Sequence, residues 1–374
     1  MIRVGVIGAG AAALTAHLPA LTALDQFEVV GLCDTSPARL AAVLGRFPVP
    51  GFAEPDALLG LPDLDAVVIA TPPQTHATLA AKAMERGKHV LCEKPLAPTV
   101  QECRQLLEMS ARTGTVLAVG HEKRFHPSLR RVRDLLAAGS LGTPFYAGVH
   151  WGAAAKLEPE RLIPPGFRHG YEWRWRDPAV GGGLLQDHLP HYVDLLRFWT
   201  AQEPVGVLAY TVNVARDFLG WAPEHSVWED FCLAVVRYSA GLVLRFETSV
   251  VGRSISPIWS LGSGMGEWTE YGYLLCSDGQ LVFDLLPWDS SENGRIAVNR
   301  KGGEGWLYVE QPEPVRRDGG AASEMFQGQA VAWAGAIEGE PSSVARGEDG
   351  LICIAAVEAA YRAADTCAEV SLST

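Results

Sequence analysis

The chain has 374 residues, 48% of them hydrophobic and 20% charged. This length corresponds to roughly two or three domains, and the composition excludes a disordered or fibrous protein. Acidic residues outnumber basic ones by 43 to 31, a formal charge of −12, which disfavours nucleic acid or an anionic membrane as a partner. No apolar run approaches the ~20 residues that span a bilayer, so we expect no membrane-spanning helix.

The cysteines are odd in number, and no two are spaced as Cys-x-x-Cys. Disulfide frameworks and structural zinc sites usually show paired or clustered cysteines. We therefore expect reduced thiols and a cytoplasmic location. The seven cysteines lie at positions 33, 92, 103, 232, 276, 353 and 367.

The first 120 residues alternate short apolar, β-branched runs with helical patterns, which predicts a parallel sheet covered by helices on both faces. Two helices are expected at 76–86 and 100–112, the second opened by a capping box of Thr99 and Glu102. The expected strands cover residues 2–7, 28–33, 66–70, 89–92 and 116–119.

After Gly139 the pattern changes to long β-rich stretches joined by tight turns, which predicts antiparallel hairpins at 231–250 and 271–286. All eleven tryptophans lie at or after Trp151, so the two halves are built differently. A last helix is expected at about 348–365. We place the domain boundary at residue 122, giving domains 1–122 and 123–374.

A dinucleotide site is predicted where the first strand runs into Gly8-Ala9-Gly10-Ala11-Ala12-Ala13, a G-x-G-x-x-A motif. The glycines allow a tight turn and close approach of a pyrophosphate, and the helix N-terminus offers free N–H groups. Asp34 ends the next strand and suits the ribose hydroxyls of NAD, whereas Arg39 keeps NADP open. Glycines that only make a βα turn are the alternative. The residues expected to bind the cofactor here are Gly8, Gly10, Ala11, Ala12, Asp34 and Arg39.

Several further motifs resemble the Gfo/Idh/MocA family of glucose-fructose oxidoreductase and inositol dehydrogenase relatives, over nearly the whole chain. They are Thr71-Pro72-x-x-x-His76, Gly87-Lys88-His89-Val90, Glu93-Lys94-Pro95, Arg124-Phe125-x-Pro127, Gly181-Gly182-Gly183 with Asp187-x-x-x-His191, and Glu348-Asp349-Gly350-Leu351. The chain departs from the family pattern at Pro73, where many members have Asn. It also departs at His188, Leu189 and Pro190, where other residues are usual.

The resemblance implies an N-terminal Rossmann domain, doubly wound around a parallel sheet, and a C-terminal α+β domain with a large open antiparallel sheet. One face of that sheet would meet a partner subunit in a homo-oligomer, a dimer or tetramer. The implied catalytic set is Lys94, Asp187 and His191, and the further implied cofactor contacts are Thr71, Pro72, His76, Glu93 and Lys94.

Lys94 follows an apolar strand at the carboxyl edge of the predicted sheet, where such folds bind ligands. A lysine partly removed from water there can donate to a substrate hydroxyl or take its proton. The alternative is a solvent-exposed lysine that pairs with Glu93.

Asp187, His191 and Asp194 are spaced i, i+4, i+7, so they share one helical face. A solvated polar face is one alternative. Another is a metal site that adds His188 to these three residues, although nicotinamide chemistry needs no metal. Pro190 should cost the helix a hydrogen bond, so we expect the helix to start near Asp187 or to kink there.

These features together predict an NAD(P)-dependent dehydrogenase that transfers a hydride between nicotinamide and a secondary alcohol of a sugar, cyclitol or related polyol. His191 would take the hydroxyl proton, Asp187 would hold its ring, and Lys94 would polarise the oxygen. NAD-dependent glycoside hydrolysis and a non-catalytic cofactor-sensing regulator stay open as alternatives. The expected substrate contacts, which core packing would explain equally well, are Arg124, Trp151, Arg168, Trp173 and His188.

Overall fold

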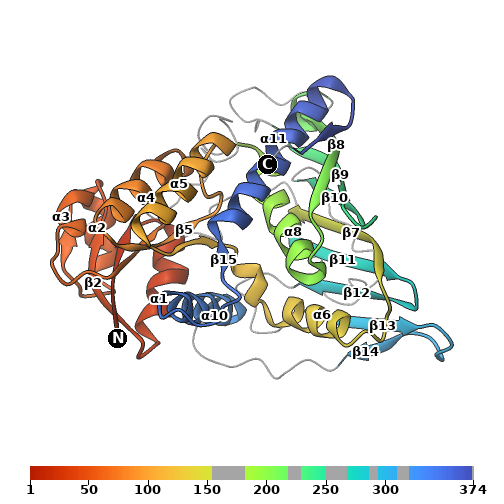
Figure 1. The fold of residues 1–374 in the computed structure, drawn as a ribbon, viewed down its shortest axis with the longest axis horizontal. Coiled ribbons are helices and arrows are strands. Elements are labelled where there is room, and N and C mark those ends of the chain that lie inside the picture. Colours follow the sequence, from red (N-terminus) through yellow and green to blue (C-terminus); the bar gives the residue numbers. More distant parts are fainter. Residues whose placement is uncertain (154–181, 218–228, 250–267, 286–293, 310–319, 373–374) are drawn as a thin grey trace.

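A computed structural model describes residues 1–153, 182–217, 229–249, 268–285, 294–309 and 320–372. The described elements form two sheets, with helices around the first sheet and between the two (Figure 1). No helix among the described residues is long and apolar enough to cross a membrane.

The first sheet has seven strands in the order β15-β6-β5-β4-β1-β2-β3, all parallel except β15, which runs antiparallel to β6. All five predicted strands are confirmed, whereas β3 and β15 are two residues long and were not predicted. The strands are β1 Ile2–Ile7, β2 Phe27–Cys33, β3 Gly51–Phe52, β4 Ala66–Ile69, β5 His89–Glu93, β6 Leu117–Gly120 and β15 Ala345–Arg346.

Both helices predicted in this half are confirmed as α4 and α5. The Thr99 hydroxyl accepts the backbone N–H of Glu102 at 3.2 Å, which caps α5 as the sequence predicts. The elements of this half are η1 Ala13–His17, α1 Leu18–Thr22, α2 Pro37–Leu44, α3 Pro55–Leu59, η2 Pro73–Thr75, α4 His76–Glu85, α5 Val100–Thr113, η3 Glu122–Phe125 and α6 Pro127–Ala137.

The second sheet has nine strands in the order β14-β13-β12-β11-β7-β10-β9-β8-β16. Both predicted hairpins, β9 with β10 and β11 with β12, are confirmed, and only β7 and β10 pair in parallel. The strands are β7 Pro144–Ala153, β8 Pro204–Val212, β9 Phe231–Tyr238, β10 Val243–Ser249, β11 Trp268–Cys276, β12 Gly279–Leu285, β13 Ile296–Arg300, β14 Leu307–Val309 and β16 Val370–Ser371.

Two helices connect the sheets, α8 (Leu184–Thr200) and α11 (Gly347–Thr366), as Figure 1 shows at the centre of the molecule. Cys353 and Ala356 of α11 pack in the core of the second sheet, whereas Ile354 and Ala355 pack in a core of the first. The last helix therefore packs against both halves. The short helix α9 covers Val214–Asp217.

The chain returns to the first sheet before α11. Helix α10 (Gly320–Ile337) packs against α1 and η3, and its Trp333 ring stacks on Phe27 with centroids 6.0 Å apart. Strand β15 and helix α10 thus join the first sheet and its covering helices, which start at residue 1. The boundary at residue 122 stays a prediction, since later elements also belong to this layer.

Candidate active site

The predicted dinucleotide loop lies between β1 and the first helical turn. Gly8 has a φ of 105°, and an added Cβ would lie 2.5 Å from the Ala70 carbonyl oxygen, so only glycine fits there. At Gly10 an added Cβ would meet only that oxygen, at 4.0 Å. This open side of Gly10 leaves room for a pyrophosphate beside the loop. The residues therefore fit a dinucleotide, with Ala11 and Ala12 at the helix entrance.

The first helix starts with a wide π turn, η1, and continues as α1, with Pro19 in the first turn of α1. Pro19 therefore stands inside a continuous helical run, directly after the π turn, and does not end it.

Asp34 fastens the end of β2 to the glycine loop. Its carboxylate accepts the backbone N–H groups of Ala9 at 2.8 Å and Ser36 at 2.7 Å. The half-exposed Arg39 guanidinium lies 3.2 Å from the same carboxylate. Asp34 and Arg39, which the sequence assigns to recognition of the ribose, thus form an ion pair with each other, and the Arg39 side chain is the exposed member.

His76 is only 1% exposed, and its two ring nitrogens lie 2.8 Å from the carbonyl oxygens of Thr71 and Pro95. It therefore links the turn after β4, which carries Thr71 and Pro72, to the turn after β5. Direct cofactor contact by His76 stays a prediction, and both of its ring nitrogens lie against backbone carbonyls.

Glu93 ends β5 and Lys94 follows it, and the Lys94-Pro95 peptide bond is cis. Glu93 accepts from His17 Nε2 at 2.7 Å. Burial raises the pKa of Glu93, but the hydrogen bond and charge of His17, with the charge of Lys94, outweigh burial and lower it. Glu93 therefore stays ionised beside Lys94.

Lys94 is buried and reaches α8. Its Nζ donates to Asp187 Oδ1 at 2.5 Å and to the Asp187 carbonyl oxygen at 2.8 Å. The alternative of a solvent-exposed lysine paired with Glu93 is therefore wrong. An ammonium has three N–H donors, so one remains for a substrate oxygen.

Helix α8 begins at Leu184, after the glycine triplet, and runs through Pro190. The prediction of a start near Asp187 is wrong, because the first turn is held from outside the helix. The buried Glu229 carboxylate accepts the backbone N–H of Leu185 at 3.1 Å and the Tyr361 hydroxyl at 2.8 Å. An added Cβ at Gly183 would lie 1.9 Å from that carboxylate, which explains a glycine there.

His191 is 5% exposed, and its Nδ1 has no hydrogen-bond partner among the described residues. Its Nε2 lies 4.0 Å from Glu122 Oε1. Burial lowers the pKa of His191 well below its ordinary value, and the charges of Lys94 and Lys123 lower it further. The imidazole is therefore neutral at neutral pH. Asp187 binds Lys94 instead of holding this ring, which corrects the predicted division of roles.

Asp194 shares the face of Asp187 and His191 but is bound elsewhere. Arg124 donates to both of its carboxylate oxygens, at 2.7 and 2.6 Å, and also pairs with Asp349 at 3.1 Å. Arg124 is 6% exposed and held by these two carboxylates, and its predicted substrate contact stays a prediction. The polar face of α8 is buried, which also excludes the solvated alternative.

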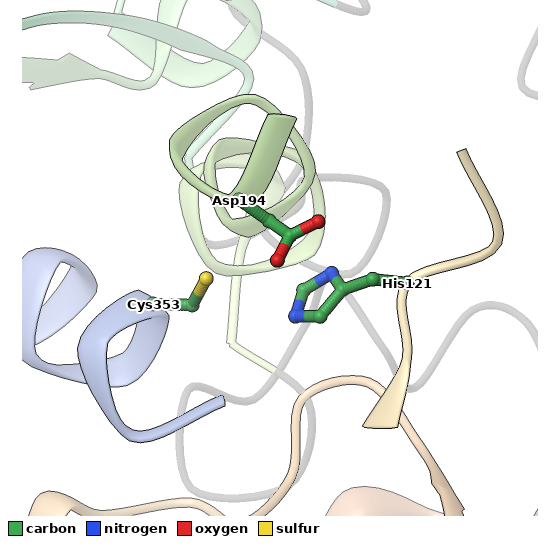
Figure 2. A group of neighbouring side chains, drawn as sticks. All are labelled: His121, Asp194 and Cys353. Carbon is green, nitrogen blue, oxygen red and sulfur yellow. The ribbon is translucent and has the colours of Figure 1, made fainter. Parts of the chain in front are cut away.

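One group of potential metal ligands occurs in the described ranges, namely His121, Asp194 and Cys353, which converge from three elements (Figure 2). His188 and His191 do not belong to it, so the ligand set weighed from the sequence is not assembled. Arg124 already occupies both oxygens of Asp194, and its positive charge disfavours a cation at the same place.

Trp151 and His188 lie beside Asp187. Their rings stack with centroids 3.6 Å apart, and His188 Nε2 is 3.6 Å from Asp187 Oδ2. Both side chains are buried, so they contribute to the wall next to the Lys94 ammonium. The predicted substrate contacts Arg168 and Trp173 lie outside the described residues.

Sequence analysis missed three residues that shape this site, Glu122, Glu229 and His17. Glu122 follows a strand end at the same sheet edge as Lys94, a signal that could have identified it. No local pattern marks Glu229 or His17, because their partners are distant in the sequence.

Comparison with known proteins agrees with this geometry. A model described as an oxidoreductase family with an NAD-binding Rossmann fold matches residues 2–121, and a GFO/IDH/MocA C-terminal domain model matches residues 129–256. The uncharacterized oxidoreductase YdgJ of Escherichia coli is 32% identical over 272 residues, which cover 72% of this chain and 71% of the relative. The chain belongs to the GFO/IDH/MocA oxidoreductase family. The predicted family, fold class and NAD-binding domain are confirmed.

Two further comparisons span the whole chain of this GFO/IDH/MocA oxidoreductase. A 1,5-anhydro-D-fructose reductase of Ensifer adhaerens is 28% identical over 367 residues, covering 98% of this chain and 97% of the relative. The solved structure of a levoglucosan dehydrogenase with NADH and levoglucosan has a TM-score of 0.80 at 20% identity and covers 100% of both chains. At that identity, the second comparison shows a shared fold.

Proposed function

We propose that this GFO/IDH/MocA oxidoreductase interconverts a secondary alcohol and a ketone on a sugar, cyclitol or related polyol, with NAD as the preferred cofactor. The observation that carries the proposal is the buried contact between Lys94 and Asp187, with His191 one helical turn further along α8. The names of two relatives, an anhydrofructose reductase and a levoglucosan dehydrogenase, support the substrate class.

Bound NAD supplies the hydride acceptor, and the chain's own residues handle the proton. His191, neutral because it is buried, accepts the hydroxyl proton. The third N–H of Lys94 donates to the substrate oxygen while charge develops on it. Asp187 positions Lys94 by fixing two of the three ammonium donors. The stacked rings of Trp151 and His188 lie beside Asp187 and form part of the wall next to this group.

The experiment that tests this function is a screen of sugars, cyclitols and their acids with NAD and NADP in parallel, read by formation of reduced cofactor. We expect turnover with at least one polyol and a higher kcat/KM with NAD. Sugar released without net reduced cofactor would instead support glycoside cleavage. Tight NAD binding without turnover on any substrate would contradict the dehydrogenase.

We also propose a homo-oligomer that forms through the second sheet. Its strands alternate buried residues with half-buried ones, so the face away from α8 and α11 carries a row of partly exposed apolar side chains. Partly exposed apolar side chains gathered on one face of a sheet are typical of a subunit interface, and the ion pair of Arg245 and Glu247 on β10 adds charges to this face. Members of this face are Tyr146, Leu233, Val235, Val243, Tyr271 and Tyr273.

A cytoplasmic location completes the proposal. All seven cysteines are free thiols, and six of them are buried. Unpaired cysteines are typical of proteins in a reducing compartment. Titration of the denatured chain with a thiol reagent, without reductant, should detect seven thiols, and fewer would contradict this location.

A further inference from the structure

Glu122 occupies a place at the site that the catalytic set does not use. It begins η3 directly after β6, and β6 pairs with β5 so that Gly120 lies opposite Glu93. Glu122 therefore projects from the same sheet edge as Lys94. Its Oε1 lies 4.0 Å from His191 Nε2, and both side chains are largely buried, at 15% and 5% exposure.

His191 needs a partner of this kind. A proton taken from a substrate would turn its ring into a buried cation next to Lys94 and Lys123, which disfavour a second positive charge. Asp187 is engaged by the Lys94 ammonium. Among the described residues, the carboxylate that makes an ion-pair contact with His191 is Glu122.

The neighbouring cations are bound to other carboxylates. Lys94 pairs with Asp187, Lys123 with Glu270, and Arg124 with Asp194. From β5, Glu93 faces Glu122 and holds its own charge through His17. From α10 the neutral Gln329 approaches the Glu122 backbone, and from the start of α6 His126 is buried.

Within the described part of the chain, Glu122 thus has no cation paired with it alone, and the neighbouring Glu93 stays ionised. Burial raises the pKa of Glu122 to about 7, and the charge of Glu93 adds to this, against the opposing charges of Lys94 and Lys123. Two carboxyl groups whose environments separate their affinities for a proton are typical of acid–base sites.

We propose that Glu122 is the proton relay of the active site, taking a proton from His191 as His191 removes one from the substrate hydroxyl. The inference rests on the proposed function. In oxidation, the substrate O–H bond breaks and an N–H bond forms on His191. The new N–H bond forms on Nδ1, which has no hydrogen-bond partner among the described residues. The N–H bond of Nε2, the nitrogen that faces Glu122, then breaks, and an O–H bond forms on Glu122. Bound NAD would accept the hydride from the substrate carbon. Reduction runs through the same steps in reverse, so His191 never has to store the charge.

A nuclear magnetic resonance titration tests the contact without any substrate. His191 itself titrates far below neutral pH, so a change of its ring resonances near pH 7 reports the ionisation of Glu122. We expect this step in the wild-type chain with NAD bound, its loss in Glu122→Gln, and its retention in Glu85→Gln, which alters an exposed glutamate of α4. The relay would be overturned if the His191 resonances of the wild type showed no titration step near pH 7. It would also be overturned if that titration step persisted in Glu122→Gln.

Kinetics tests the role with a polyol found in the screen. Wild-type kcat for oxidation should fall as the pH drops below about 7, because protonated Glu122 cannot accept a proton. Glu122→Gln should lower kcat by roughly 10- to 100-fold and abolish this pH limb. Glu122→Asp should keep the limb, and NAD affinity and KM should change less than about twofold in both variants.

The relay would be overturned if Glu122→Gln kept the kcat of the wild type and the fall of kcat below pH 7. It would also be overturned if this variant lost only its affinity for NAD. If the wild-type chain oxidises no polyol, the proposed function fails, and the resonance titration alone decides the contact between His191 and Glu122.

Discussion

At the scale of one residue, Lys94 is the group that we propose polarises the substrate oxygen. Two of its three ammonium donors are fixed by Asp187, through the carboxylate at 2.5 Å and the backbone oxygen at 2.8 Å. This arrangement aims the remaining donor, and it offsets the cost of keeping a charged side chain at 9% exposure. The cofactor loop at Gly8 and Gly10 does not depend on this ammonium for its own geometry.

Lys94→Ala should therefore abolish turnover, by about 10³-fold or more in kcat, while NAD affinity stays nearly intact. Steady-state kinetics and titration of intrinsic tryptophan fluorescence with NAD would measure the two quantities. Lys82→Ala, which removes an exposed lysine of α4 paired with Asp56, should leave both unchanged. An equal loss of turnover and NAD affinity in Lys94→Ala would argue against its catalytic role.

Helix α8 shows how an element is positioned for function. Its first turn is held by Glu229, which lies 44 positions from Leu185 in the sequence and fills the space that a side chain at Gly183 would need. Gly183 is therefore a packing requirement of the turn that presents Asp187. Helix α8 begins before Asp187, at Leu184, and runs through Pro190.

Gly183→Ala should lower the free energy of unfolding by about 2 kcal/mol, because the new methyl group displaces the buried Glu229 carboxylate from its hydrogen bonds. Urea denaturation followed by circular dichroism would measure the change. Gly45→Ala is the matched control, since a Cβ there meets only backbone oxygens at 3.6 Å, and it should change stability by less than about 0.5 kcal/mol. Equal stability of the two variants would exclude the packing role of Gly183.

The same contact predicts a pH dependence of stability. Burial raises the pKa of Glu229 to about 7 from an ordinary value of 4.5, so the folded chain binds more protons than the unfolded chain between these values. Stability contributed by protonated Glu229 is therefore present at low pH and lost as the pH rises through 7. Glu229→Gln should lose less stability than the wild type between pH 5 and pH 8, by up to about 3 kcal/mol. Parallel pH profiles in urea would contradict this origin.

The sequence predicted the elements of the first half because each strand is a short β-branched run and α5 carries its own cap at Thr99. It also placed Asp187, His191 and Asp194 on one face of α8. It could not predict their separate partners, Lys94, Glu122 and Arg124, because helical spacing does not specify what packs against a face. Arg124 was therefore assigned to substrate, and Asp187 to the ring of His191.

On the scale of the whole molecule, the residues that we propose as catalytic come from the surroundings of both sheets. Lys94 and Glu122 project from the carboxyl edge of the first sheet, whereas Asp187 and His191 lie on α8, which packs on the second. Helix α11 contributes to the cores of both sheets and fixes α8 relative to the first half (Figure 1). Motif spacing could predict each cluster of residues. It could not predict that the two clusters lie together, because that depends on β15, which brings the chain back to β6 before α11 begins.

The outward face of the second sheet leads to a prediction about assembly. Leu233 and Val235 of β9 are only partly buried, while their neighbours Cys232, Ala234 and Val236 lie in the core. An arginine on the outward face points away from the core, so the monomer should still fold, but burying its charge against a second copy is costly. Val235→Arg should therefore shift the wild-type oligomer towards monomers in sedimentation velocity experiments. Val331→Arg, at an exposed position of α10, should sediment like the wild type. A wild-type chain that sediments as a monomer, or an oligomer that Val235→Arg leaves intact, would exclude this face as the interface.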